Sequence, residues 1–441
     1  MNTQNLPMQL CTGSIKMKPV SYLKPYANNP RTHSKKQIRQ VADSINTFGW
    51  TNPILIDSGG GIIAGHGRLE AAKLLGMSDV PVLQIDNMSE AGKRAYIIAD
   101  NKLAENAGWD DNLLAIELQG LLDLDIEFNI ELTGFEMGEI DVLLSDDTPP
   151  EPETVPLPET DNLPVSRHGD LWLIGPHRLY CGNSLEKSSW HALMGGDKAQ
   201  MIFTDPPYNV PIAGHVSGLG QAKHREFAMA SGEMTQEDFT EFLHKSFRNL
   251  ADISDNGAVH FICMDWRHMG EVLDAADGVY SELKNLCVWA KTNAGMGSFY
   301  RSQHELVFAF KHGTASHINN FGLGDTGRYR SNLWTYAGAN TFRAGRLDDL
   351  GAHPTVKPIE MISDAVMDCS KRGSIIADAF AGSGTTLLAA AKTGRIGVGI
   401  EIDAHYADLT IRRLQDATGE TAINADSFES FEATETGRRT K

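Results

Sequence analysis

The chain has 441 residues, 41% of them hydrophobic and 22% charged, with a formal net charge of −18 at pH 7. This is the composition of a globular protein of two or three domains, which excludes disordered and fibrous classes. The sequence shows no long apolar run, no export leader and no C-x-x-C among its five cysteines, so we expect a soluble protein of a reducing cytoplasm without disulfide or cysteine-zinc sites.

The first predicted unit is small and mixed α+β, over residues 15–105. Ser34, with Gln37 three residues on, is typical of a helix start, and Gly49 can end that helix. The stretch PILIDSGGGIIAGHGRLEAAKLLG then indicates strand, turn and strand leading into a helix that Gly76 can cap.

An acidic region follows. Residues 106–145 predict a helical, acidic extension, and residues 146–164 contain six prolines among carboxylates, which indicates an interdomain linker. Thirteen acidic and no basic residues lie between positions 123 and 161, whereas residues 284–346 carry eight basic residues against two acidic ones. Although the net charge of the chain is negative, one basic surface can therefore bind phosphates.

After the linker, short apolar segments such as MIFT, HFICM, LVFAF, SIIAD and IGVGIE alternate with helical patterns. One helix has Thr235 with Asp238 in the capping positions. This alternation predicts an α/β domain with a doubly wound, mainly parallel sheet over residues 165–418, and a polar tail over 419–441.

A glycine-containing turn, AGSGTT, connects the strand SIIADAF to an alanine-rich helix. Gly382 and Gly384 allow close backbone approach, and the helix start presents free amides. Glu401, at the end of the next strand, can accept hydrogen bonds from both hydroxyls of a ribose. A purely structural turn is the alternative, but the pattern favours a nucleoside-containing ligand, and without a G-K-[ST] lysine it does not indicate a P-loop.

The sequence DPPY ends the strand MIFT. Its prolines stiffen the turn, so that the Asp205 carboxylate and the Pro206 carbonyl can both accept protons from one amino group, while Tyr208 can stack on a base. A strand exit stabilised by prolines is the alternative. The glycine turn further along the chain favours an amine-binding site.

Together these segments resemble the β group of amino-methylating DNA methyltransferases, over roughly residues 165–418. The matching motifs, in chain order, are DPPYN (205–209), Trp289 with Lys291, His304 with Glu305, HPTVKP (353–358), DAFAGSGTT (378–386) and GIEID (399–403). The resemblance implies a Rossmann-like methyltransferase sheet, S-adenosyl-L-methionine as cofactor, no required metal, and duplex DNA as partner.

The resemblance also implies roles for individual residues. It assigns the flipped target base to Asp205, Pro206, Pro207 and Tyr208. It assigns the cofactor to Asn183, Thr355, Lys357, Asp378, Phe380, Gly382, Gly384, Thr385 and Glu401, with Thr355 and Lys357 at the methionine end. Asn183 stands where the family commonly has Asp, and its amide oxygen can still accept from an adenine amine, so we expect altered cofactor affinity.

Base choice also rests on the resemblance, because Asp at the first motif position is typical of N6-adenine enzymes and Ser of N4-cytosine enzymes. We therefore expect adenine, with N4-cytosine, a non-catalytic DNA-binding regulator, and RNA or protein glutamine targets as alternatives. Sequence readout is expected in an insert at about residues 293–350. Its candidate DNA contacts, for which a solvated arginine surface is the alternative, are Arg301, Arg328, Arg330, Arg343 and Arg346.

Residues 15–105 resemble the ParB-like domain related to sulfiredoxin, through LKPYANNPRTHS, NPILID and IIAGHGRLEAAKLLG. In that fold the turn before a helix can bind nucleotide phosphates. The candidates here are Gly65, His66, Gly67 and Arg68. DNA or nucleotide binding is favoured over nuclease activity, a homodimer is a further candidate assembly, and the setting implied is restriction-modification in a prokaryotic cell, prophage or phage origin included.

Overall fold

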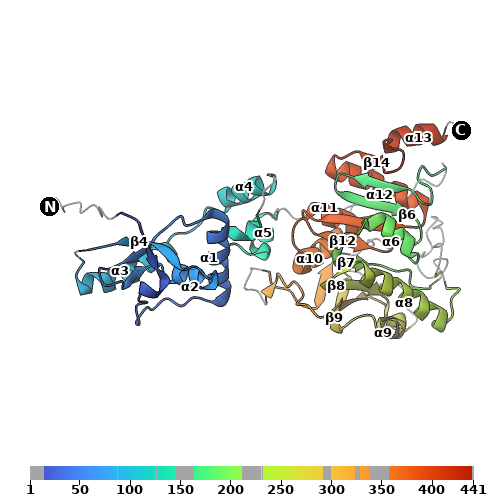
Figure 1. Ribbon diagram of the computed structural model, residues 1–441. Coiled ribbons are helices and arrows are strands. Elements are labelled where there is room, and N and C mark those ends of the chain that lie inside the picture. The colour runs from blue at the N-terminus through green and yellow to red at the C-terminus, as the bar shows by residue number, and fades with distance from the viewer. Residues whose placement is uncertain are drawn as a thin grey trace, which may run out of the picture. The chain divides into compact units, whose positions relative to one another are not determined.

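The computed structural model describes residues 14–86, 88–124, 128–145, 163–210, 230, 232–291, 299–322, 328–337 and 357–439. The chain forms two compact units, Met1–Glu136 and Met137–Lys441 (Figure 1). Within the described ranges, none of the helices combines the length and apolar character that a membrane crossing requires.

The N-terminal unit is a small α+β domain, as predicted. Its sheet has the order β1-β4-β2-β3, with β2 and β4 parallel and the outer pairs antiparallel. The strands are β1 (Lys16–Pro19), β2 (Ile54–Ile56), β3 (Ile62–Ala64) and β4 (Asp79–Gln84). The helices are η1 (Val20–Tyr22), α1 (Lys35–Phe48), α2 (His66–Leu74), α3 (Glu90–Glu105), α4 (Asp111–Leu122) and η2 (Ile130–Thr133).

The predicted helix boundaries in this unit are confirmed. The Ser34 hydroxyl accepts the Gln37 amide at 3.1 Å, which satisfies one of the free donors at the start of α1. Gly49 and Gly76 end α1 and α2 with φ of 75° and 67°, a left-handed region that favours glycine. Beneath the helices, apolar residues of β2 and β4 pack on Leu69 of α2 to form the core.

The C-terminal unit contains a ten-stranded sheet of order β11-β9-β10-β8-β7-β12-β13-β6-β5-β14. The strands are β5 (Leu171–Ile174), β6 (His177–Cys181), β7 (Ala199–Thr204), β8 (Ser254–Met264), β9 (Glu282–Lys291), β10 (His304–Lys311), β11 (Leu333–Tyr336), β12 (Ile375–Asp378), β13 (Ile396–Glu401) and β14 (Ala422–Asn424). The five central strands, from β8 to β6, are parallel. Antiparallel pairs extend them on both sides, so the sheet is mixed around a parallel centre.

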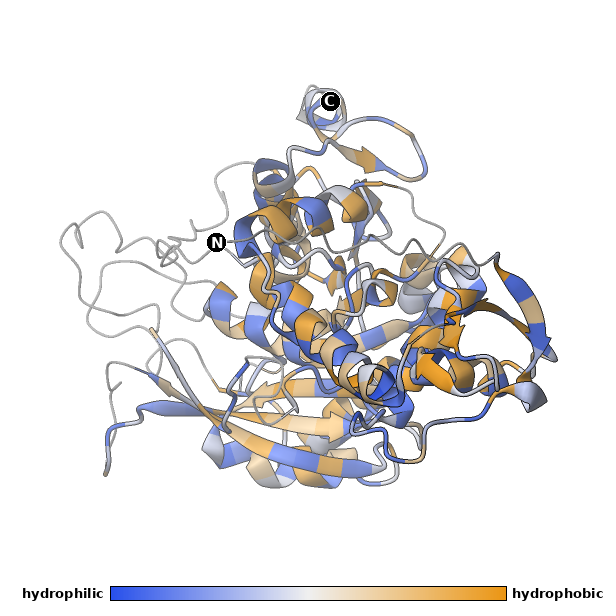
Figure 2. Cartoon of the chain, turned by 90° about the vertical axis from the view of Figure 1, so that its left-hand side faces the viewer, coloured by the Kyte–Doolittle hydropathy of each residue, from blue (hydrophilic) through white to orange (hydrophobic). Residues whose placement is uncertain are grey.

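Helices cover both faces of this sheet, as a doubly wound fold requires. They are α5 (Met137–Leu143), α6 (Lys187–Met194), α8 (Gln236–Asp252), η3 (Trp266–His268), α9 (Met269–Ala276), α10 (Ile359–Cys369), α11 (Thr385–Lys392), α12 (Ala404–Thr418) and α13 (Phe431–Arg439). Along β7, Met201 and Phe203 pack with α10 and α11, whereas Ile202 packs with α6 on the opposite face. Both faces are thus buried. Helices visible in Figure 2 carry both hydrophobic and hydrophilic residues along the same ribbon.

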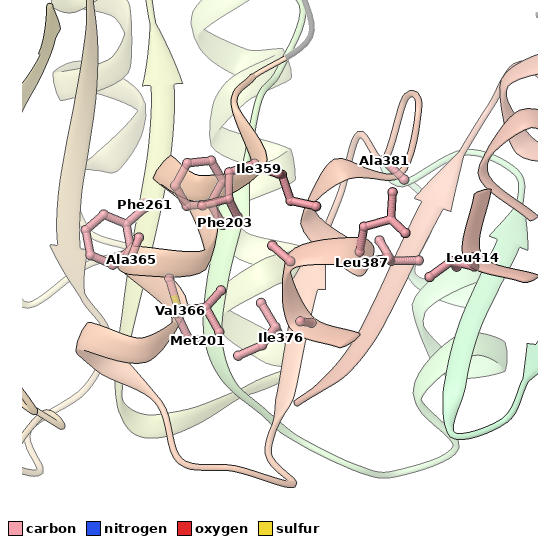
Figure 3. Close-up of a cluster of buried hydrophobic side chains, with 14 of the residues drawn as sticks. Met201, Phe203, Phe261, Ile359, Ala365, Val366, Ile376, Ala381, Leu387 and Leu414 are labelled. Atoms are coloured by element: carbon pink, nitrogen blue, oxygen red, sulfur yellow. The ribbon is translucent and has the colours of Figure 1, made fainter. Parts of the chain in front are cut away.

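The largest core lies between β7, β12 and the helices α10, α11 and α12 (Figure 3). Leu387 of α11 is fully buried there, a burial that contributes about 1.5–3 kcal/mol for a leucine side chain. The close approach of α11 to β13 depends on Gly397, where a Cβ would lie 2.6 Å from the Leu387 Cα. This packing fixes the start of α11 at the carboxyl edge of the sheet.

Helix α5 belongs to the C-terminal unit, although it precedes the proline-rich segment. Its Asp141 is completely buried and pairs with both terminal nitrogens of Arg395, at 2.8 and 2.7 Å, and with the Arg372 Nε at 3.0 Å. On the other side of that segment, the amides of Val165 and Ser166 donate to the Asp408 carboxylate. Residues 146–162, the main part of the predicted linker, lie outside the described residues.

The end of the chain, expected as a polar tail, contributes to the fold. Strand β14 pairs with β5, and the fully buried Phe431 of α13 packs edge-on against Trp172, with ring centroids 5.3 Å apart. A three-residue strand is too short to show a hydrophobic period, which explains why the sequence pattern did not indicate it.

Candidate active site

The predicted motifs meet at one edge of the sheet because β7, β12 and β13 are adjacent and parallel. Asp205 follows β7, the glycine turn follows β12, and Glu401 ends β13. The hydroxyl of Thr204 donates to the Asp378 carboxylate at 2.8 Å and so ties the first motif to the second. This is the edge where open α/β sheets bind their ligands.

Asp205 has two close partners. Its Oδ1 accepts the Tyr208 hydroxyl at 2.8 Å, and its Oδ2 accepts the Lys357 ammonium at 2.5 Å. Burial raises the pKa of Asp205, and the nearby Glu305 raises it further, against the lowering effect of Lys357. Burial alone would lower the pKa of Lys357, but Asp205 and Glu305 outweigh it and raise that pKa, so the lysine remains charged. The sequence predicts Lys357 at the methionine end of the cofactor, whereas its ammonium contacts Asp205 in the structure.

Glu305 completes this cluster. Its Oε2 lies 3.1 Å from the Lys357 Nζ and 3.1 Å from the Tyr208 hydroxyl, and its Oε1 accepts from Lys291. Burial opposes its ionisation, but the two lysines outweigh burial and hold its pKa at about 2. The Trp289 ring lies beside both ammonium groups, with centroid distances of 4.8 Å to Lys291 and 6.0 Å to Lys357. Sequence reasoning matched Lys291 and Glu305 to a family motif but gave them no role.

The glycine turn has a fixed shape. Gly384 is the N-cap of α11 with φ of 81°, and a Cβ there would lie 2.6 Å from the Thr410 side chain. Gly382 has φ of 52°, and its carbonyl accepts the Thr410 hydroxyl at 2.9 Å. The first amides of α11, which starts with the buried Thr385, thus stand at the carboxyl edge of the sheet.

Glu401 and Asp378 hold this turn in place by accepting hydrogen bonds from its backbone amides. The Glu401 carboxylate accepts the Gly382 amide at 2.7 Å and the Asp403 amide at 2.8 Å, yet burial raises its pKa to about 7. Asp378 accepts from Thr204, Thr386 and the Phe380 amide, and burial raises its pKa to about 6. A buried carboxylate beside a glycine turn fits the hydroxyls of a nucleoside cofactor.

Two other predicted cofactor residues are also placed. The Phe380 ring lies 5.8 Å from the Phe242 ring and is half-buried. The Asn183 side-chain oxygen accepts the Leu185 amide at 3.0 Å, which orients its amide group. Thr355 lies outside the described residues.

The candidate DNA-binding arginines fall into three groups. Arg301 is exposed, whereas Arg343 and Arg346 lie outside the described residues. Arg328 and Arg330 both pair with Asp364 and Asp368 of α10, and Arg328 is only 9% exposed. In this structure these two guanidinium groups therefore anchor the chain before β11 to α10, which accounts for them without a nucleic acid.

In the N-terminal unit, Gly65 has φ of 100° and caps α2. The Nε2 of His66 accepts the Tyr26 amide at 3.2 Å, and Arg68 donates to the Asn52 carbonyl at 3.1 Å. A Cβ at Gly67 would lie 3.2 Å from the His33 ring. Gly65 is thus the N-cap of α2, whereas His66, Gly67 and Arg68 lie in the first turn of the helix and not in the turn before it. Nucleotide binding there remains a prediction. Across the described part of the chain, no group of three His, Cys, Asp or Glu side chains is arranged to hold a metal ion.

Comparison with known families agrees with this geometry. Residues 199–412 match the DNA methylase family of N6 and N4 methyltransferases, and residues 7–102 match the ParB N-terminal domain. Residues 112–168 match the ParB-methyltransferase HTH domain, in a region where the sequence pattern predicts an acidic extension and a linker.

Individual relatives cover the two parts separately. The ParB-like nuclease domain-containing protein YnaK of Escherichia coli is 50% identical over 80 residues, 18% of this chain and 92% of that protein. The type II methyltransferase M2.DpnII of Streptococcus pneumoniae is 27% identical over 230 residues, 50% of this chain and 84% of that protein. The type II methyltransferase M2.MboI of Moraxella bovis is 25% identical over 257 residues, 54% of this chain and 88% of that protein.

Proposed function

Because the chain belongs to the N6-adenine/N4-cytosine DNA methylase family and carries a ParB N-terminal domain, we propose that it methylates the N6 amine of adenine in duplex DNA, using S-adenosyl-L-methionine. The observation that carries this proposal is the position of Asp205, which shares one sheet edge with the glycine turn and with Glu401. An amine acceptor and a nucleoside-binding carboxylate at the same edge support transfer between a base and a nucleoside cofactor.

The cofactor and the residues of the site have separate roles in methyl transfer. When bound, S-adenosyl-L-methionine supplies a methyl group on a sulfonium, a good leaving group. The Asp205 carboxylate and the Pro206 carbonyl accept the protons of the base amine, which turns the nitrogen lone pair toward that methyl group. The amine proton would become acidic only once the C–N bond has formed and the S–CH3 bond has broken, with the electron pair of that bond left on sulfur. Asp205, whose pKa is raised by burial, would then take the proton.

Access to the amine requires base flipping, at a cost of about a few kcal/mol for unstacking. Glu401 and the amides at the start of α11 would hold the cofactor at the same sheet edge as Asp205, which would hold the target amine. Positioning of this kind can supply most of the rate enhancement.

The test is methyl transfer from labelled S-adenosyl-L-methionine to mixed-sequence duplex DNA, with the modified nucleoside identified by mass. We expect N6-methyl-2′-deoxyadenosine from the unmodified protein, and formation at least about 100-fold slower with Asp205→Asn, which controls for a contaminating methylase. N4-methyl-2′-deoxycytidine would establish the alternative base. Absence of transfer by a folded protein that binds the cofactor would reject the proposal.

Glu401→Gln is expected to weaken cofactor binding by about 10- to 100-fold, because an amide accepts hydrogen bonds from ribose hydroxyls less strongly than a carboxylate. Since burial raises the pKa of Glu401 to about 7, the unmodified protein should also lose affinity as the pH falls through 7 and the carboxyl protonates. Calorimetric titration with S-adenosylhomocysteine across this range measures both effects.

Glu401→Gln should not lose cofactor affinity as the pH falls through 7, because its amide does not titrate. The exposed Asp416→Ala serves as the matched control and should keep the affinity and pH dependence of the unmodified protein. Equal affinity at pH 6 and pH 8 in the unmodified protein would contradict the role of Glu401.

A further inference from the structure

The charged cluster around Asp205 contains more groups than amine binding requires. Asp205 and Glu305 share one ammonium, that of Lys357, at 2.5 and 3.1 Å, and Glu305 has a second cation in Lys291. The Lys357 and Glu305 side chains are only 6% and 16% exposed, so these charges are poorly screened by water. A lysine held by Asp205 alone would compete directly with the base amine for the carboxylate.

The Tyr208 hydroxyl is also shared between Asp205 and Glu305. Burial raises the pKa of its hydroxyl well above the usual value, so it keeps its single proton. That hydroxyl lies 2.8 Å from Asp205 and 3.1 Å from Glu305, but one proton can serve only one of the two carboxylates at a time. Glu305 is therefore an alternative acceptor for both donors that occupy Asp205.

From this arrangement we propose that Glu305 is a positioning residue for methyl transfer: it draws Lys357 and the Tyr208 hydroxyl away from Asp205, which leaves Asp205 free to accept the base amine. This inference rests on the proposed function. When the amine arrives at Asp205, the Tyr208 proton turns to Glu305, and Lys357 moves toward the same carboxylate. No covalent bond changes in this exchange. Lys291 limits the movement of Lys357 toward Glu305, because Lys291 competes with Lys357 for the same carboxylate.

The alternative is that Glu305 only neutralises two buried lysines. The two roles differ in how activity depends on pH, because Asp205 must be ionised to accept the amine. The groups that face Asp205 are Lys357, Glu305, Tyr208, Cys263 and Asp378, with Lys291 beyond Glu305. Removing the Glu305 charge leaves Lys357 on Asp205 alone and should lower the Asp205 pKa, whereas removing Lys291 should raise it.

The experiment measures kcat at saturating DNA and cofactor across pH for the full chain, for Glu305→Gln and for Lys291→Met. We expect Glu305→Gln to lower the maximum kcat of the pH profile by about tenfold, the free energy of about one hydrogen bond to a charged group. We also expect the acid limb, the pH range in which kcat falls as Asp205 protonates, to move to lower pH. Lys291→Met should keep most of the maximum kcat and move the acid limb to higher pH. Glu305→Asp, which keeps the charge, should restore the original acid limb.

A kcat for Glu305→Gln equal to that of the unmodified protein, or a reduced kcat with an unmoved acid limb, would overturn the positioning role. Should Glu305→Gln fail to fold, Lys291→Met tests the positioning role instead. An acid limb of the kcat–pH profile that does not move to higher pH in Lys291→Met would also overturn that role. Failure of the proposed function is distinguishable, since the unmodified protein would then show no transfer at any pH.

Discussion

Asp205→Asn is expected to lower kcat for methyl transfer by about 100- to 10,000-fold, the range typical of a lost proton acceptor in the transition state. Asparagine keeps the size of the side chain but replaces one acceptor oxygen with an NH2 donor. Lys357 donates to Oδ2, so an amide NH2 in that position places a donor against a donor. In the other orientation the NH2 faces the Tyr208 hydroxyl, which must then turn its proton to Glu305. The amide also cannot take the proton that the methylated amine releases.

Radiolabel transfer under single-turnover conditions measures this effect without product release. Cofactor affinity should change by less than about threefold, because Glu401 and the glycine turn are untouched, and this binding is the internal control for folding. A variant that kept kcat within tenfold of the unmodified protein would show that Asp205 does not hold the reacting amine.

Asp141→Ala is expected to lower the free energy of unfolding of the C-terminal unit by about 3–5 kcal/mol, the cost of leaving a buried charge without its partner. Arg395 is 2% exposed and donates to both oxygens of Asp141. Its other partners, the carbonyls of Thr393 and Ser370 and the Ser370 hydroxyl, carry no charge. Alanine therefore leaves a guanidinium in the interior without a counter-ion.

Urea unfolding followed by circular dichroism gives the difference. The exposed Asp416→Ala removes one acidic group of the same unit without a buried partner and should change stability by no more than about 0.5 kcal/mol. A loss below about 1 kcal/mol in Asp141→Ala would mean that water or a neighbouring group reaches Arg395.

The sequence allowed prediction of features that depend on local rules. The capping side chains of Ser34 and Thr235 accept the expected amides, and Gly49 and Gly76 end their helices as expected. The common edge for Asp205 and Glu401 followed from the strand pattern, because parallel strands end together. These features require only neighbours in sequence or a repeated period.

Features that depend on distant charges could not be predicted in this way. Lys357 meets Asp205 across 152 positions, and Arg395 meets Asp141 across 254. Charged residues lie mostly in solvent, so the sequence indicates only an acidic extension around Asp141 and a candidate DNA contact at Arg330. Only the fold shows which of them are buried and paired.

The Asp141 ion pair also decides where the protein can be divided. Because α5 is held by Arg395 and Arg372, and the Val165 and Ser166 amides by Asp408, the two flanks of residues 146–162 belong to the same unit. Proteolytic cleavage in that stretch should therefore nick the protein without releasing its N-terminal portion. A functional chimera that exchanges the ParB domain should be joined before Met137, since a junction in the proline-rich stretch would separate Arg395 from its native counter-ion.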